Sequence, residues 1–164
     1  MSERDDILET LAVHRRFLLH TVQGITDAQA RQRTTVSELT LGGIVKHVAV
    51  TEQQWARFIV EGTVALATTD TSFAEHAASF VLGEGETLAD VVAGYEAIAN
   101  HTDQLVRGLP DLDLAHALPE APWFPPGATR SARRVFLHVV AETAQHAGHA
   151  DIVREALDGQ KTMG

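Results

Sequence analysis

Hydrophobic residues recur every three or four positions in four long stretches of the chain, which is the period of an amphipathic α-helix. The stretches cover about residues 4–23, 41–61, 87–108 and 131–158. The third has the cleanest repeat, which follows a Thr87-Leu-Ala-Asp90 capping pattern and stops before Gly108. No alternating run in the sequence indicates a strand. The pattern therefore predicts an all-α protein built as a four-helix bundle.

The connections between these helices are longer than the roughly two to eight residues usual in bundles. We therefore expect long crossover loops, one of them with a short helix around residues 73–80. All five prolines lie between residues 110 and 126, together with Trp123 and Phe124. This stiffened segment leads into the last helix, where it could either wall a pocket or cover the end of the bundle.

The last predicted helix carries polar residues where apolar ones are expected. At about 100° per residue, one core-facing arc holds Val135, His138, Glu142, His146, His149, Val153 and Leu157. Burying a carboxylate with imidazoles costs several kcal/mol unless they are paired or coordinate a cation. Glu142 and His146 lie one turn apart and could hold one divalent metal ion. His138 and His149 lie one turn further out, so we expect them to support or pack around this pair.

A third ligand has to come from another helix, and His47 lies on the apolar side of the second one. A lone histidine there is often only a hydrogen-bonded core residue. Thr51 could line the cavity, and Glu52 is expected to pair at its edge. An ion pair in place of the metal would need a cation on the same face, and Lys46 and Arg57 are poorly placed for it. The other histidines show no ligand spacing and are expected at the surface or rim: His14, His20, His76, His101 and His116.

Composition narrows the choice of function. A length of 164 residues predicts a single domain, 1–164. The chain has 13 Lys and Arg against 22 Asp and Glu, and the resulting net charge of −9 disfavours a nucleic-acid partner. No apolar run of about 18 residues and no signal-peptide pattern is present, so we expect a cytoplasmic protein without a membrane partner. A homodimer is compatible with the sequence. Cysteine is absent, so any thiol chemistry requires a small-molecule thiol.

Two segments resemble a known family. Residues 40–47 read Thr-Leu-Gly-Gly-Ile-Val-Lys-His, with Glu52 and Trp55 behind them, and residues 137–155 read Leu-His-Val-Val-Ala-Glu-Thr-Ala-Gln-His-Ala-Gly-His-Ala-Asp-Ile-Val-Arg-Glu. The chain resembles the DinB/YfiT-like superfamily of metal-binding four-helix bundles, in its mini-circle protein branch. It is similar to the mycothiol-dependent transferases and to the amino-terminal domain of the mycothiol-dependent maleylpyruvate isomerases.

The resemblance implies a metal site. In this superfamily one histidine of the second helix and two residues four apart on the last helix bind the metal, which implies His47, Glu142 and His146 as ligands. Glu142 stands where many relatives have histidine, as it also does in the isomerases. Zinc is the expected ion, with nickel or ferrous iron as alternatives. The implied cosubstrate is a low-molecular-weight thiol, mycothiol or, in other branches, bacillithiol. No counterpart of the additional carboxy-terminal domain of the isomerases is expected.

The expected function is thus a metal-dependent S-transferase that conjugates a low-molecular-weight thiol to an electrophile. Two alternatives remain open. One is a non-catalytic metal-stabilised bundle that serves as a stress-linked binding or dimerisation module. The other is a metal-dependent hydrolase that activates water, for which Glu52 is the only candidate general base. A requirement for added thiol in turnover separates the transferase from the hydrolase.

Overall fold

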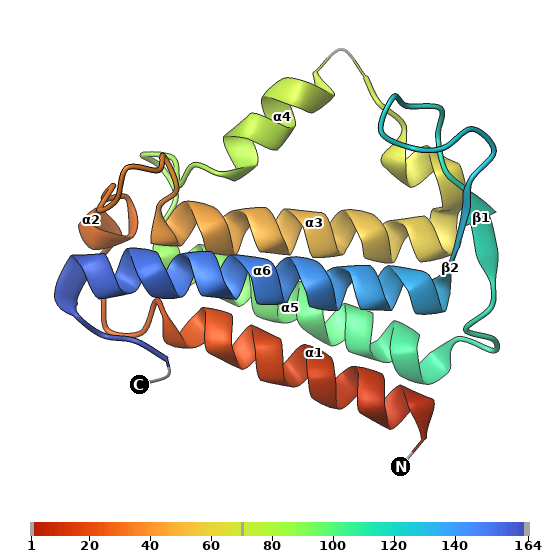
Figure 1. Cartoon of the computed structure of the whole chain (residues 1–164), viewed down its shortest axis with the longest axis horizontal. Coiled ribbons are helices and arrows are strands. Elements are labelled where there is room, and N and C mark those ends of the chain that lie inside the picture. Colours follow the sequence, from red (N-terminus) through yellow and green to blue (C-terminus); the bar gives the residue numbers. More distant parts are fainter. Residues whose placement is uncertain (1, 70, 163–164) are drawn as a thin grey trace.

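Four long helices make up most of the computed structural model, which describes residues 2–69 and 71–162. They are α1 (Glu3–His20), α3 (Leu41–Glu61), α5 (Leu88–Gly108) and α6 (Ala132–Asp158). In Figure 1 they lie side by side, with α1 and α6 running in one direction and α3 and α5 in the other. Each packs against two neighbours, in the order α1, α6, α3, α5 around the bundle. None of the described helices is both long and apolar enough to cross a membrane. The predicted four-helix bundle is confirmed.

Side-chain caps and glycines decide where these helices begin and end. Thr40, Thr87 and Ser131 each accept a hydrogen bond from the backbone N–H three residues further on, at the starts of α3, α5 and α6. α3 and α6 end at Gly62 and Gly159, which have φ angles of 72° and 82°. The first helix ends at His20, earlier than the predicted residue 23, because the chain turns over residues 21–24.

The connections carry shorter elements. α2 (Asp27–Ala30) lies between α1 and α3, while the 3₁₀ helix η1 (Gly62–Leu66) and the predicted short helix, α4 (Ser72–Ser79), lie between α3 and α5. Strands β1 (Ala115–Ala117) and β2 (Thr129–Ser131) pair antiparallel between α5 and α6. The expectation of no strands is therefore wrong, because three-residue strands are too short to show an alternating pattern. Figure 1 shows α4 outside the bundle, on the side of α3.

The most buried face of α6 differs from the predicted one. Val135, Val139, Thr143 and Ala150 are almost fully buried, whereas His138, Glu142 and His149 are only half-buried. α6 packs against both α1 and α3, so its most buried arc points between these two helices. Of the ligand-type residues, only His146 is buried, and the other three lie at the α3 edge of the core, next to solvent.

Candidate metal centre

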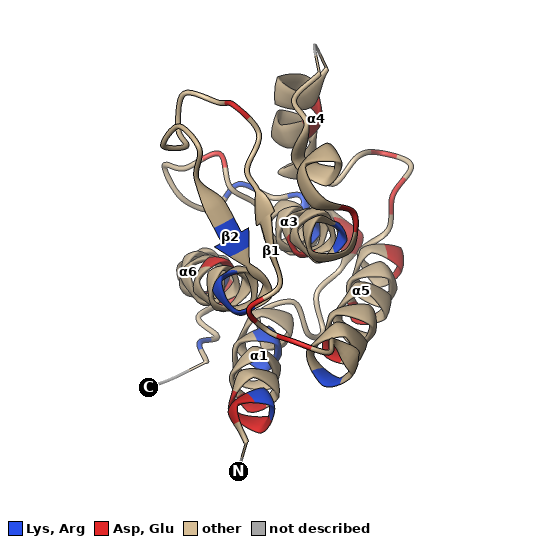
Figure 2. Cartoon of the chain, turned by 90° about the vertical axis from the view of Figure 1, so that its right-hand side faces the viewer, with Lys and Arg blue, Asp and Glu red and all other residues tan. Residues whose placement is uncertain are grey.

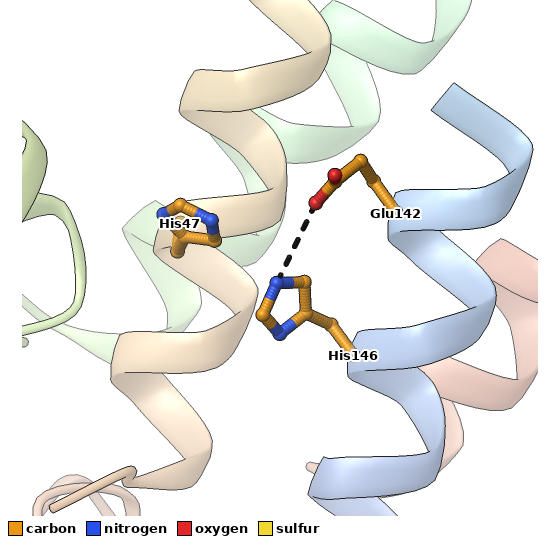
Figure 3. A group of neighbouring side chains, drawn as sticks. All are labelled: His47, Glu142 and His146. Atoms are coloured by element: carbon orange, nitrogen blue, oxygen red, sulfur yellow. Dashed lines mark ion pairs between the residues drawn. The ribbon is translucent and has the colours of Figure 1, made fainter. Parts of the chain in front are cut away.

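Three side chains from two helices meet where α3 packs against α6. His47 projects from α3, and Glu142 and His146 project toward it from α6 (Figure 3). Each offers one ligand atom, and these atoms lie within 4.8 Å of one another. His146 Nε2 is 3.7 Å from Glu142 Oε2. Atoms that bind one zinc ion at about 2 Å lie roughly 3–4 Å apart. The tertiary structure thus brings the three predicted residues together in a group that could hold one divalent ion after small side-chain shifts.

A chain of hydrogen bonds fixes the proton on the His47 ring. Ser79 Oγ lies 2.6 Å from the carbonyl oxygen of His76 and 2.9 Å from His47 Nδ1. A carbonyl can only accept, so the Ser79 hydroxyl donates to it and accepts from the N–H at Nδ1. The lone pair is then on Nε2, the nitrogen on the side of Glu142 and His146 (Figure 3). This is the tautomer that a metal ligand needs.

The end of α4 also fixes the plane of the His47 ring. The Phe80 ring stacks on it, with centroids 3.6 Å apart and an interplanar angle of 15°. This close packing requires a glycine in α3, because a Cβ at Gly43 would lie only 1.9 Å from the Phe80 carbonyl oxygen. Gly43 therefore allows the end of α4 to reach the ligand, whereas a Cβ at the neighbouring Gly42 would meet Leu82.

Burial keeps both imidazoles of the cluster neutral. It lowers the pKa of His47 to about 4, and repulsion from His146 and His76 adds to this effect. Burial also lowers the pKa of His146, with a further contribution from His149. Neutral imidazole is the form that binds metals, so both rings have their ligand form at neutral pH.

The two outer histidines of α6 support the cluster, as predicted. His138 Nε2 lies 3.7 Å from Glu142 Oε1, and its ring packs edge-on against Trp55 with centroids 4.8 Å apart. His149 Nδ1 lies 3.4 Å from His146 Nδ1. His138 thus contacts the Glu142 carboxylate from one side, and His149 contacts the His146 imidazole from the other.

His76 was expected at the surface or rim, and that expectation is confirmed, but the residue also lies next to the cluster. Its side chain is exposed, but its ring centroid lies 5.2 Å from that of His47. The hydroxyl of Thr51, which was expected to line the cavity, lies 3.4 Å from His47 Nε2. Sequence spacing could not reveal His76, because only the packing of α4 over α3 brings it to the cluster. His116 instead packs against Phe58, at the far end of α3.

Glu52 does not lie at the edge of the cavity, so that prediction is wrong. It is 1% exposed and forms a buried ion pair with Arg15 of α1, which also contacts Asp103 Oδ1 of α5 at 2.7 Å. The sequence did contain a signal, because Arg15 falls at helical spacing between Leu11 and Leu18 on the apolar side of α1. A carboxylate already paired in this way is not available as a general base at the cluster.

No lysine or arginine of the described structure neutralises Glu142. Its ion-pair contacts there are with His138 and His146, whose charge depends on protonation. Lys46 pairs with Glu86, and Arg57 pairs with Glu61, each at 2.7 Å, as expected from their poor placement. The arrangement therefore favours a metal ion over a salt bridge as the partner of the carboxylate.

A cavity of about 400 Å³ adjoins this cluster. It lies between α3, η1, α4 and the connection from β1 to β2, and its wall includes Trp55, Phe73, His76, Pro119, Trp123 and Phe124. The structure supports both interpretations of the proline-rich segment, because Pro119 and Trp123 line the cavity while Leu118 is buried in the hydrophobic cluster at the end of the bundle.

Comparison with known families identifies the family of the chain. A sequence model of the family described as Mycothiol-S-transferase (MST) matches residues 6–159. The chain belongs to this family. The three residues of the His-Glu-His cluster and the residues that line the cavity all lie within the region that matches the mycothiol S-transferase family.

Solved structures add a comparison at the level of the fold. The "conserved protein of locus" from Enterococcus faecalis, a crystal structure, superposes with a TM-score of 0.72 at 16% sequence identity. The alignment covers 98% of this chain and 99% of that one. At this identity the likeness shows the shared fold alone. A search of curated protein sequences found no match.

Proposed function

We propose that this protein binds one divalent metal ion through His47, Glu142 and His146 and transfers a low-molecular-weight thiol to an electrophile. The observation that carries the proposal is the cluster itself. Its three ligand atoms lie within 4.8 Å of one another, and the described structure provides no lysine or arginine for the carboxylate. Three protein ligands leave a coordination position open, which is typical of catalytic zinc. Zinc is the expected ion, and nickel and ferrous iron are the alternatives.

Bound at this position, a divalent ion would lower the pKa of a coordinated thiol from its usual value of about 8.5. The chain has no cysteine, so the thiol is a separate molecule, and family membership supports mycothiol. The His47 and His146 rings would donate their lone pairs to this ion, and Glu142 would reduce the net charge of the centre. The thiolate sulfur forms a C–S bond to the electrophilic carbon. The leaving group departs with the electron pair of the broken bond, and the thiol proton passes to water.

The hydrolase alternative loses its general base. Glu52, the residue considered for that role, is buried in the ion pair with Arg15. A neighbouring base is what a water-activating site would require. The transferase needs no such group, because a metal ion held by the cluster would itself lower the pKa of the thiol.

The test combines metal content with turnover. Protein isolated without a metal-binding tag should carry close to one divalent ion per chain, and His146→Ala should lose it. His101→Ala, an exposed histidine of α5, is the matched control and should retain the ion. Mycothiol and glutathione are then compared with a haloalkyl bimane between pH 6 and 8, with and without a chelator.

The expected rate is highest relative to background with mycothiol and at the acidic end, where free thiols are protonated. Equal metal content in wild type and His146→Ala would refute the ligand set. Bound metal with background rates for every thiol would support the non-catalytic binding module, and thiol-independent ester hydrolysis would support the hydrolase.

A further inference from the structure

Exposed aromatic side chains face each other at the cavity beside the cluster. Phe73 of α4 is 71% exposed and Trp123 of the β1–β2 connection is 55% exposed, yet their rings lie edge to face with centroids 6.1 Å apart. Trp55 and Phe124 continue the aromatic wall. Two separate crossover segments thus hold large apolar rings in partial contact with water. Such surface is typical of a ligand site.

The described residues that line this cavity include no Asp, Glu, Lys or Arg. Its polar lining groups are Gln54, Thr68, Ser72 and His76. Figure 2 shows the same property at the level of the chain, because α4 and the β1–β2 connection are mostly free of charged residues. A charged group placed there would lose hydration without gaining an ion-pair partner. The lining therefore favours an uncharged ligand.

Two residues connect the cavity to the cluster. Trp55 lines the cavity and contacts His138, which lies 3.7 Å from Glu142. His76 also lines the cavity, and its ring is 5.2 Å from that of His47. His47, Glu142 and His146 do not themselves line the cavity, so Trp55 and His76 form the boundary between a ligand held there and the cluster. The volume of about 400 Å³ suits a small molecule with one or two rings.

We propose that this aromatic cavity is the electrophile site and that it selects uncharged aromatic electrophiles. The inference rests on the proposed function. The ring lies between Trp55, Phe73 and Trp123, and its reactive carbon points toward the cluster. For a benzylic bromide, the thiolate sulfur forms the C–S bond while bromide leaves with the electron pair of the C–Br bond.

Arg130 offers the strongest argument for an anionic ligand instead. Its guanidinium packs over Trp55, 5.8 Å from the ring centroid, and its buried Nε has no acceptor among the described residues. Arg130 is not among the residues that line the cavity, so its charge does not form part of the cavity wall. The uncharged class is therefore favoured, and a carboxylate-bearing probe tests the alternative.

Binding can be measured independently of catalysis, because both tryptophans of the chain line the cavity. Unreactive nitrobenzene should quench their fluorescence saturably in metal-loaded and in chelator-treated protein, and 4-nitrobenzoate should bind at least tenfold more weakly. Phe73→Ala should weaken nitrobenzene binding roughly three- to tenfold, the size expected for one aromatic contact. Ile152→Ala, which removes an exposed side chain of α6, should have no effect.

Turnover gives the second measurement. With metal and mycothiol present, Phe73→Ala should reduce the preference for 4-nitrobenzyl bromide over iodoacetamide by a similar factor, while Ile152→Ala leaves this preference unchanged. Non-saturable quenching, equal binding by Phe73→Ala, or preferred binding of 4-nitrobenzoate would overturn the proposal. Metal-dependent transfer to iodoacetamide without an aromatic preference would refute only the electrophile site. Saturable binding without transfer to any electrophile would refute only the proposed function.

Discussion

Replacing Ser79 by alanine tests whether α4 prepares His47 for metal binding. The substitution removes the acceptor that lies 2.9 Å from His47 Nδ1. Ser79 is only 3% exposed, so water cannot easily take its place. The ring would then be free to carry its proton on Nε2, where Thr51 Oγ1 at 3.4 Å is an alternative partner. That tautomer has no lone pair for the metal.

Two estimates of the loss in zinc affinity, one from the hydrogen bond and one from the orientation of the histidine, overlap near a factor of ten. A neutral hydrogen bond contributes about 0.5–1.5 kcal/mol, which corresponds to a factor of roughly 2 to 13. Loss of a group that orients a metal-binding histidine usually costs about 10- to 100-fold in affinity. Phe80 still stacks on the ring at 3.6 Å, so the ring plane is retained and the smaller effect is expected. We therefore expect Ser79→Ala to weaken zinc binding about tenfold.

The assay is competition for zinc with a chelating dye at pH 7, with Ser72→Ala as the control. Ser72 lies on the same helix, but its hydroxyl contacts Thr69 and not His47. Imidazole ¹⁵N shifts of the metal-free wild type should show the proton on Nδ1 of His47, and Ser79→Ala should shift the population toward Nε2. Unchanged zinc affinity in Ser79→Ala, or a wild-type ring protonated on Nε2, would refute the reasoning.

Three further predictions concern the framework of the site. Arg15→Leu leaves the buried carboxylate of Glu52 unpaired, so it should lower the free energy of unfolding in urea by about 3–5 kcal/mol. The double variant Arg15→Leu with Glu52→Leu should recover most of this loss. Equal stability of the single and double variants would contradict the prediction. In metal-free protein His47 has a folded pKa of about 4 against 6.5 when unfolded, so the unfolded state binds more protons as pH falls. Between pH 7 and 5 the free energy of unfolding should therefore fall about 2 kcal/mol more for wild type than for His47→Gln, and parallel losses would exclude the effect. Gly43→Ala should displace α4 and weaken zinc binding, while the circular dichroism spectrum remains that of a helical protein. The control is Gly94→Ala, where a Cβ would enter open space, and it should not weaken zinc binding. Normal zinc affinity in Gly43→Ala would show that the position of α4 does not depend on this glycine.

The sequence alone determined the helices and the identity of the three clustered residues. Helical periodicity and capping side chains at Thr40, Thr87 and Ser131 are local properties, so the positions of α3, α5 and α6 could be predicted from them. The spacing of Glu142 and His146 is also local, because residues four apart share one face of a helix.

Only the tertiary structure decided what surrounds those residues. α4 is a short helix whose place depends on packing against Gly43, so neither the approach of His76 nor the role of Ser79 could be predicted from spacing. The same holds for the partner of Glu52, since Arg15 is distant in sequence and the two meet only when α1 and α3 enter one core. The exposure of Glu142 was decided by the position of α6 between two neighbours, which turns the most buried arc of the helix away from this carboxylate. Local periodicity fixes which residues share a helix face, whereas packing between helices fixes what each face contacts.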